Sequence, residues 1–389
     1  MPTLDAEVER QKLSKRDAAL ATAIVYGTLR ALPRIDSVLD AHLDRPAKLD
    51  PWVRAALRAG AFQILCLDRI PVRAVVHETV SLVKAKRGRL GGLANAVLRK
   101  VKRPEPVEAP SLVLPEWIEA SFALSDARLE AIRSAAEPGI DLRVPADRDA
   151  VIAALRARLP DAEVRAGDFE QTVHVRGGGN PRRWPGYANG RFVVQEQGAQ
   201  IIGALVDAQP GERILDACAG RGGKTVQLAE AMRGEGAITA VDLHEARVEQ
   251  IAATMKRLGL TTPVSVETID WTVGDGGLEG GFDRILIDAP CTGLGTLHRR
   301  PEILLRLKPE DVGAMAALQK TILHRVAPLL RPGGVLVYAV CSLAKEECSV
   351  DVLSELGRLL PLEGADEDGI LRLGPWTGCD GYQIAHLKD

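Results

Sequence analysis

The chain has 389 residues, more than one compact core usually needs, so we expect two or three domains. Hydrophobic residues make up 46% of the sequence, and no apolar run reaches the roughly 18 residues that could span a bilayer. The first twenty residues are charged and lack the pattern of a secretory signal. These features argue against a membrane or secreted protein and predict a soluble, cytoplasmic one.

Charge is unevenly distributed along the chain, although its formal net value is only −2. Residues 1–103 hold 20 Lys and Arg against 10 Asp and Glu, a net charge of +10. The remaining residues hold 30 against 42, a net charge of −12. Such asymmetry indicates a front part that binds nucleic acid and a more acidic body.

The six cysteines are scattered, with no C-x-x-C pair. We therefore expect free thiols, with no zinc site or other metal site and no disulfide framework. For any one of them, the default interpretation is a small buried hydrophobic residue. They are Cys66, Cys218, Cys291, Cys341, Cys348 and Cys379.

The front part has the periodicity of helices. Apolar residues recur at helical spacing from Arg16 to about Lys102, which predicts an all-helical domain over residues 1–103. Residues 84–103 contain eight basic residues and no acidic one, a run that could be no more than a solvated helical face. The sign of the whole domain, and the glycine pair at 91–92 that allows a phosphate to approach closely, favour nucleic-acid binding.

A proline-rich stretch follows, and we predict a linker over residues 104–116 because this composition resists regular structure. Over residues 117–190 the expected elements are short. They are a strand at 140–144, a helix at 151–159 and a strand at 171–176. We predict a small α+β subdomain here.

From residue 191 to residue 389, short runs rich in Val, Ile and Leu alternate with helical segments. This alternation predicts a doubly wound parallel α/β sheet. The expected strands are 213–218, 237–242, 264–268, 284–288 and 335–340, and the expected helices include 225–232, 246–259 and 316–330.

The first of these strands runs into the glycine-rich sequence DACAGRGGKT, which begins at Asp216 and opens a helix. An open α/β sheet binds its ligand at such a turn. A Walker phosphate loop would need glycine at Cys218, and the dinucleotide pattern G-x-G-x-x-G is also absent. A nucleoside ligand without phosphates fits the loop better.

Acidic residues follow successive strands and are expected to line one crevice. Asp242 could accept both ribose hydroxyls of a nucleoside, and Asp270 could accept the amine of adenine. Asp216 and Asp288 could lie near a sulfonium and an ammonium group. Each aspartate alone could be a helix N-cap, but four in register favour S-adenosylmethionine as the cofactor.

Two thiols, Cys291 and Cys341, also follow the carboxyl ends of strands. Enzymes that methylate amines favour an aromatic residue at the end of the corresponding loop. In this chain Cys291 takes that place, after Asp288-Ala289-Pro290. Carbon 5 of cytosine is too weak a nucleophile to attack a sulfonium methyl group, so a thiolate must first add to carbon 6. Free cysteine has a pKa of about 8.5, so the attacking thiol needs a cationic neighbourhood, and a second thiol could help release the product.

With these motifs the chain resembles the RsmB/Sun family of ribosomal RNA cytosine-5 methyltransferases, within the Nol/Nop/Sun group, over nearly its whole length. The resemblance implies an N-terminal NusB-like RNA-binding domain, a small α+β RNA-binding subdomain and a Rossmann-like catalytic domain. It also implies a monomer that acts on small-subunit ribosomal RNA. The matching segments are 17–30, 57–71, 92–100, 194–200, 216–225, 283–303, 331–343 and 380–387.

The resemblance assigns roles to particular residues. Cys341 would be the nucleophile, Cys291 would assist release of the methylated base, and Asp288 would contact the cofactor or the target cytosine. The remaining residues would bind S-adenosylmethionine together with Asp288. They are Cys218, Ala219, Gly220, Arg221, Gly222, Gly223, Lys224, Asp242 and Asp270.

The chain departs from the family pattern in three places. Gly220-Arg221 stands where Ala-Pro or Ser-Pro is usual, and Val340 replaces the threonine before the nucleophile. The loss of that hydroxyl bears on rate more than on reaction type. We also expect the first helix of the NusB-like domain to be missing.

Two alternatives remain open from the sequence. The same chemistry could act on transfer RNA, since the basic front domain does not separate the two substrates. The chain could instead be a non-catalytic RNA-binding or antitermination factor, although it retains both cysteines and Asp288.

Overall fold

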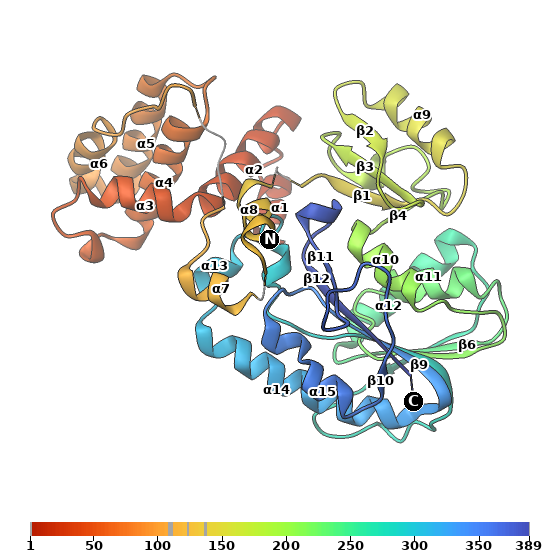
Figure 1. Ribbon diagram of the computed structural model, residues 1–389. Helices are drawn as coiled ribbons and strands as arrows, with labels where there is room; N and C mark the ends of the chain where they lie inside the picture. Colours follow the sequence, from red (N-terminus) through yellow and green to blue (C-terminus); the bar gives the residue numbers. More distant parts are fainter. Residues whose placement is uncertain (1, 108–111, 123, 136–137, 389) are drawn as a thin grey trace. The chain divides into compact units, whose positions relative to one another are not determined.

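The computed structural model describes residues 2–107, 112–122, 124–135 and 138–388 (Figure 1). Residues 108–111 of the predicted linker lie outside this set. Contacts divide the chain into a helical unit, residues 1–115, 132–135 and 300–302, and an α/β unit that contains the rest. Among the described residues, no helix is long and apolar enough to cross a membrane.

The helical unit confirms the predicted helices and has α4 at its centre, in contact with α2, α3, α5 and α6. α4 begins at a proline, and the Asp50 carboxylate before it accepts hydrogen bonds from the backbone N–H groups of Trp52 and Val53. A side chain at Gly27 would overlap the Phe62 ring, so this glycine lets α2 approach α4 closely. The helices are α1 (Pro2–Arg10), α2 (Lys15–Arg30), α3 (Leu32–Asp40), α4 (Pro51–Cys66), α5 (Val72–Arg87) and α6 (Gly91–Leu98). The short helix α1 precedes α2, and the absence of the first helix of the NusB-like domain stays a prediction.

The α/β unit begins with α7 (Glu116–Ser121) and residues 126–131 of α8 (Asp126–Ser134), followed by a small antiparallel sheet in the order β2-β3-β1-β4. α9 (Arg148–Arg158) packs on this sheet through Val151 and Leu155. The predicted strands and helix are present, whereas β2 and β4 were not predicted. The strands are β1 (Ile140–Arg143), β2 (Glu163–Ala166), β3 (Thr172–Arg176) and β4 (Val193–Val194).

The large sheet contains all five predicted strands, which run parallel in the order β9-β8-β5-β6-β7. One edge differs from the prediction, because β12 pairs with β9 in the antiparallel sense. β12 also pairs antiparallel with β11, the strand before it in the chain, so this edge of the sheet is not a parallel βαβ unit. The strands are β5 (Arg213–Asp216), β6 (Ala237–Asp242), β7 (Val264–Thr268), β8 (Phe282–Asp288), β9 (Leu330–Val340), β10 (Arg358–Leu359), β11 (Leu371–Leu373) and β12 (Tyr382–Lys388).

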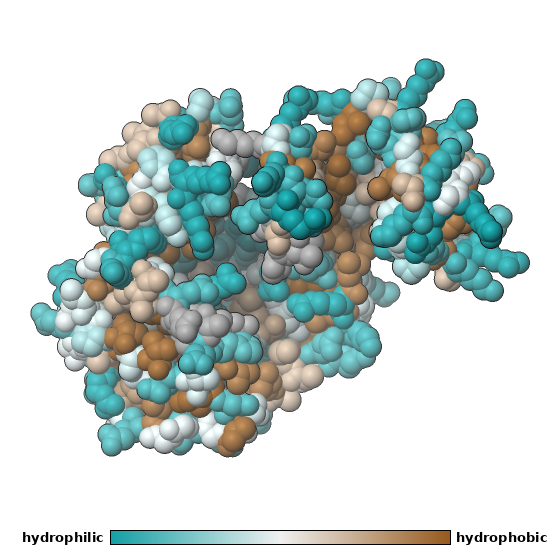
Figure 2. All heavy atoms as spheres, turned by 180° about the vertical axis from the view of Figure 1, so that it is seen from behind, coloured by the Kyte–Doolittle hydropathy of each residue, from teal (hydrophilic) through white to brown (hydrophobic). Residues whose placement is uncertain are grey.

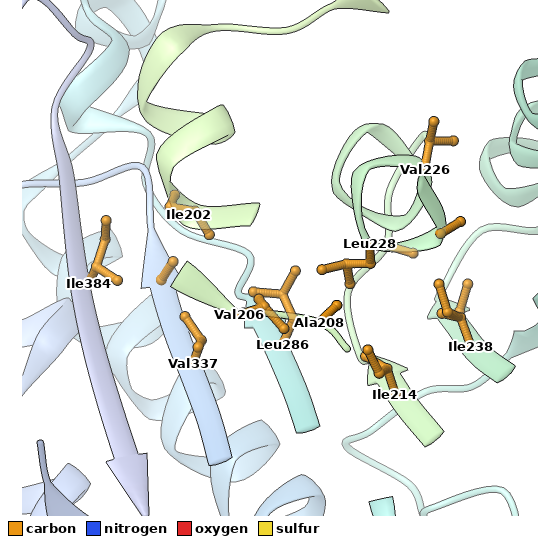
Figure 3. Close-up of a cluster of buried hydrophobic side chains, with 14 of the residues drawn as sticks. Ile202, Val206, Ala208, Ile214, Val226, Leu228, Ile238, Leu286, Val337 and Ile384 are labelled. Atoms are coloured by element: carbon orange, nitrogen blue, oxygen red, sulfur yellow. The ribbon is translucent and has the colours of Figure 1, made fainter. Parts of the chain in front are cut away.

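Helices cover both faces of this sheet, as the apolar runs predict (Figure 1). Adjacent residues of one strand enter opposite cores: Ile214 packs with α10, α11 and α12, and Leu215 packs with α14 and α15. Figure 3 shows the first of these cores, with Ile202, Leu228 and Leu286 gathered around the sheet. The helices are α10 (Gln197–Leu205), α11 (Gly223–Ala231), α12 (Glu245–Leu258), α13 (Ile303–Arg306), α14 (Pro309–Val326) and α15 (Val350–Ser354).

Candidate active site

A cavity of about 200 Å³ lies beyond the carboxyl ends of β5 and β8. From β5 the chain proceeds outward to β6 and β7, then crosses back to β8 and β9 on the other side. The strand order therefore reverses at the cavity, which is where open α/β sheets bind ligands. The lining residues are Gln195, Ala199, Asp216, Cys218, Ala219, Gly220, Arg221, Gly223, Lys224 and Asp288.

Two glycines and one aspartate shape the loop between β5 and α11. Gly220 and Gly222 have left-handed backbone conformations, with φ of +56° and +79°. A side chain at Gly222 would collide with Ile251 of α12, so only glycine fits this turn against that helix. Asp242 holds the loop by accepting from the Gly220 backbone N–H at 3.0 Å, while its other oxygen accepts from His244 N–H at 2.9 Å. Asp242 and Gly222 thus support the loop without lining the cavity.

Asp216 is a buried carboxylate at the bottom of this site. The Thr225 hydroxyl donates to its Oδ2 at 2.7 Å, and its Oδ1 is buried with no hydrogen-bond partner among the described residues. Burial raises the pKa of Asp216 to about 6, although the Thr225 hydroxyl and the nearby Lys224 charge oppose the shift. An unpartnered carboxylate oxygen beside a cavity is suited to a cationic or hydrogen-bond-donating ligand.

Lys224 and Asp288 form an ion pair, with 2.5 Å between Lys224 Nζ and Asp288 Oδ2. Burial favours the neutral amine, but the carboxylate of Asp288 outweighs this effect and raises the pKa of Lys224. The lysine is therefore charged at neutral pH. The Lys224 charge also interacts with the nearby Cys341 thiol. The pair thus places an ammonium group, balanced by the carboxylate of Asp288, in the lining of the cavity.

The structure brings the two predicted thiols together, with 3.1 Å between Cys291 Sγ and Cys341 Sγ. The hydrogen bond to Cys341, together with burial, raises the pKa of Cys291 well above its ordinary value. Cys291 therefore keeps its proton and can donate it to the sulfur of Cys341.

The other cysteines near the large sheet are poor nucleophiles. Burial and three neighbouring carboxylates raise the pKa of Cys218 well above its ordinary value, although this thiol lies beside the cavity. Burial raises the pKa of Cys348 and of Cys379 to about 12. The default interpretation, a small buried residue, therefore holds for Cys348 and Cys379.

Asp270 is not among the residues that line the cavity. Its side chain is exposed, and its Oδ1 accepts from the backbone N–H of Thr272 at 2.9 Å and from the Thr272 hydroxyl at 2.7 Å. These hydrogen bonds lower the pKa of Asp270. They are typical of an aspartate that stabilises a turn. Its contact with adenine stays a prediction.

Sequence reasoning missed two contributors to the site, Gln195 and Ala199, which line the cavity from the segment before and within α10. Gln195 is fixed by the buried Arg143, whose Nε donates to its oxygen at 2.9 Å, and it donates to Gln227 at 2.9 Å. Both residues lie in the segment 194–200 that carries part of the family resemblance. That segment was the available signal, although no chemistry could be assigned to it.

Comparison with known proteins identifies the family. Residues 203–359 match the family model described as 16S rRNA methyltransferase RsmB/F, and residues 2–103 match the NusB family model. A probable ribosomal RNA small subunit methyltransferase B of Bacillus subtilis is 34% identical, over 99% of this chain and 93% of its own. The corresponding protein of Pseudomonas putida is 32% identical, over 97% of this chain and 91% of its own. The chain belongs to the RsmB methyltransferase family.

Solved structures confirm the fold of this RsmB-family methyltransferase. The crystal structure of PH0851 has a TM-score of 0.80 and 25% sequence identity, and covers 98% of this chain and 93% of its own. A methyltransferase homologue from Pyrococcus horikoshii has a TM-score of 0.57 and 25% identity, over 71% of this chain and 100% of its own. The predicted combination of a NusB-like helical domain with a Rossmann-like catalytic domain is confirmed.

The cofactor of this RsmB-family enzyme is S-adenosylmethionine, as predicted. The cavity fits it in two respects. The unpartnered oxygen of Asp216 suits a cationic group, and the space beside Gly220 is open to a nucleoside. The lysine that would grip a phosphate in a Walker loop is instead paired with Asp288, so a phosphate-free ligand is favoured.

Proposed function

We propose that this methyltransferase modifies carbon 5 of a cytosine in small-subunit ribosomal RNA, through a covalent bond between Cys341 and carbon 6. The observation that supports this proposal is the pair of thiols, 3.1 Å apart, next to the ion pair of Lys224 and Asp288. A methyltransferase that acts on an amine or a hydroxyl does not need a nucleophilic thiol. Two thiols beside a buried cation match a reaction that forms and then breaks a bond to sulfur.

In this mechanism Cys341 attacks as the thiolate with the Lys224 ammonium nearby, and Cys291 keeps its proton, which it can donate to the sulfur of Cys341. The thiolate bonds to carbon 6, and carbon 5 becomes enamine-like. S-adenosylmethionine supplies the methyl group as an electrophile. A base then removes the carbon 5 proton, the double bond between carbons 5 and 6 re-forms, and the bond to sulfur breaks. We propose that Cys291, whose sulfur is 3.1 Å from that of Cys341, assists this release.

We assign cofactor binding to the glycine-rich loop and its supports. The residues from Cys218 to Lys224 surround the cavity or hold its shape, and Asp242 fixes the loop through Gly220 N–H. Asp216 is assigned to the cationic part of the cofactor, beside Asp288 and Lys224. Asp270 is assigned to the adenine amine on the sequence argument alone.

The affinity for S-adenosylmethionine is expected to fall as pH decreases below about 6. The pKa of Asp216 is raised to about 6, so the carboxylate is ionised above this pH and neutral below it. A cationic ligand favours the ionised form, so its affinity should decline by up to about tenfold per pH unit on the acid side. Calorimetric titration between pH 5 and 7 measures this slope. Asp216→Asn should bind more weakly with a flatter profile, and an unchanged profile would contradict the assignment.

We assign RNA binding to the helical domain, residues 1–103. Five of the eight basic residues in the run 84–103 are exposed and form no ion pair or ring contact with the described residues: Lys84, Arg89, Arg99, Lys100 and Lys102. The other three have structural contacts. Arg87 pairs with Asp50, Lys86 lies over the Trp52 ring, and Arg103 donates to three backbone carbonyl groups. Figure 2 views the molecule from behind and shows many hydrophilic side chains on that face.

RNA affinity of a Lys100→Gln, Lys102→Gln variant is expected to depend less on salt than that of the unchanged protein. Each phosphate contact that is lost should reduce the slope of log affinity against log salt by about 0.7 to 0.9. Filter binding at several salt concentrations gives the slopes. The matched control, Lys320→Gln with Lys388→Gln, removes two exposed charges from the α/β unit. Equal slopes for the two double variants would contradict an RNA surface at 100–102.

The substrate assignment follows the relatives, whose names specify the small ribosomal subunit. Transfer RNA remains the main alternative substrate, and a non-catalytic factor is disfavoured by the assembled thiols and ion pair. Incubation of the purified protein and cofactor with small-subunit ribosomal RNA or with transfer RNA separates these cases. We expect 5-methylcytidine in the ribosomal RNA only. The domain boundaries at 103, 116 and 190, a monomeric state and a cytoplasmic location remain parts of this proposal.

A further inference from the structure

A buried carboxylate lies against the residues that follow the two thiols, and it has no role in the chemistry described so far. Glu347, on the short helix Lys345–Cys348, has only 1% of its surface exposed. It forms no ion pair with the residues that the structure describes. Burying a carboxylate without a cation is costly unless hydrogen bonds replace its water. Its four hydrogen bonds therefore need an explanation.

These hydrogen bonds come from both thiol-bearing loops. Glu347 Oε2 accepts from the backbone N–H of Thr292 at 2.8 Å, and Oε1 accepts from the Thr292 hydroxyl. Oε1 also accepts from the Ser342 hydroxyl at 2.5 Å. Thr292 directly follows Cys291, and Ser342 directly follows Cys341. One carboxylate thus connects the residue after each thiol.

A third element completes the arrangement. Gln319 of α14 donates to Glu347 Oε2 at 3.0 Å and to the carbonyl oxygen of Pro290, the residue before Cys291, at 2.9 Å. The hydroxyl of Tyr338 donates to the Glu347 backbone carbonyl at 2.8 Å. The carboxylate is therefore fixed from α14 as well as from the loops, and the backbone of Glu347 is fixed from the sheet.

We infer that Glu347 is a positioning residue, which sets the separation and mutual orientation of the Cys291 and Cys341 thiols. The inference rests on the proposed function, in which both thiols act on one base. The last sheet hydrogen bond between the two strands joins Ala289 N–H to the Ala339 carbonyl, and each loop then continues past its thiol. Beyond that point Glu347 joins the loops, together with the hydrogen bond between the hydroxyls of Thr292 and Ser342 at 3.1 Å and the bond from Gly295 N–H to the Cys341 carbonyl at 3.1 Å.

Two substitutions separate geometry from charge. In Glu347→Gln, the amide oxygen can replace Oε2, and the amide N–H can donate to the hydroxyls of Thr292 and Ser342, which can turn to accept. This variant should keep the loops in place without a negative charge. Glu347→Ala removes every one of these bonds. Glu212→Ala, which deletes a carboxylate bound to Arg284 at the other end of the sheet, is the control for lost stability.

Phenylarsine oxide measures the separation of the thiols without RNA or cofactor. Its arsenic condenses with two neighbouring thiols, forming two arsenic–sulfur bonds and releasing one water molecule. The unchanged protein should bind one equivalent, and Cys341→Ala should lose it. Glu347→Gln and Glu212→Ala should bind within about threefold of the unchanged protein, whereas Glu347→Ala should bind at least about tenfold more weakly, since displacement by about 1 Å disrupts a two-group site.

Methyl transfer provides the second measurement. Glu347→Ala should lower kcat by about 10- to 100-fold and leave the affinity for S-adenosylmethionine unchanged, with Glu347→Gln restoring most of the rate. If Glu347→Ala does not fold, Ser342→Ala tests the same connection and should weaken arsenic capture in the same direction. Unchanged capture and unchanged kcat in Glu347→Ala, or in Ser342→Ala if it replaces that variant, would overturn the inference. If the unchanged protein captures arsenic but makes no 5-methylcytidine, the proposed function fails and the positioning role stands.

Discussion

Cys341→Ala is expected to abolish methyl transfer, with a rate at least about 10³-fold below that of the unchanged protein. Without this thiol no bond to carbon 6 can form, and carbon 5 stays too weak a nucleophile. Cofactor affinity should stay within about twofold, because Cys341 is not among the residues that line the cavity. The measurement is incorporation of labelled methyl groups into RNA, with calorimetry for the cofactor.

Cys66→Ala is the matched control, since it removes a buried thiol from the helical unit. Truncating a buried cysteine should cost stability but should not stop the reaction. If Cys341 only packed at the end of a strand, its substitution would behave like this control. A Cys341→Ala protein that folds, binds the cofactor and still transfers methyl groups would refute the covalent mechanism.

Cys291→Ala is expected to accumulate RNA that is covalently attached to the protein. Cys341 remains able to attack, and the methyl group is transferred, but release of the base is impaired because the neighbouring thiol is gone. The adduct should withstand denaturing electrophoresis. After one turnover, most of the active protein should be covalently bound to RNA. The double variant with Cys341→Ala should lose it, because the adduct depends on the nucleophile.

The location of the adduct tests the assignment of the two roles. The hydrogen bond to Cys341 and burial raise the pKa of Cys291, which favours Cys291 as the protonated partner in the proposal that Cys341 is the nucleophile. Accumulation of the adduct in Cys341→Ala would reverse this assignment. Absence of any adduct in both single variants, with only modest loss of stability, would indicate two buried cysteines that pack against the sheet.

The parallel core of the fold could be predicted because its strands are buried on both faces. Runs such as 284–288 are continuously apolar except at their ends, and this pattern is characteristic of a sheet covered by helices on both sides. β4 is only two residues long and β2 has one buried residue, so neither produces a readable pattern. The antiparallel pairing of β12 could not be predicted, because strand direction depends on the connection and not on the strand's own residues.

The candidate site was predictable where its residues follow strands directly. Asp216, Asp288 and Cys341 each come at or just after the end of a predicted strand, so parallel pairing brings them to one edge. Glu347 has no such signal, since its role depends on where Thr292 and Ser342 come together after folding. Arg103 gives the opposite case. It belongs to a basic run that predicts RNA contact, but it is occupied by carbonyl groups of its own domain.

The position of the transferred methyl group tests the central claim most directly. Small-subunit ribosomal RNA can be incubated with the purified protein and labelled S-adenosylmethionine, digested to nucleosides and analysed by mass spectrometry against authentic standards. We predict labelled 5-methylcytidine with the unchanged protein and none with the Cys341→Ala variant. Label in N4-methylcytidine or in a ribose-methylated nucleoside would contradict it, because neither product requires a thiol adduct at carbon 6.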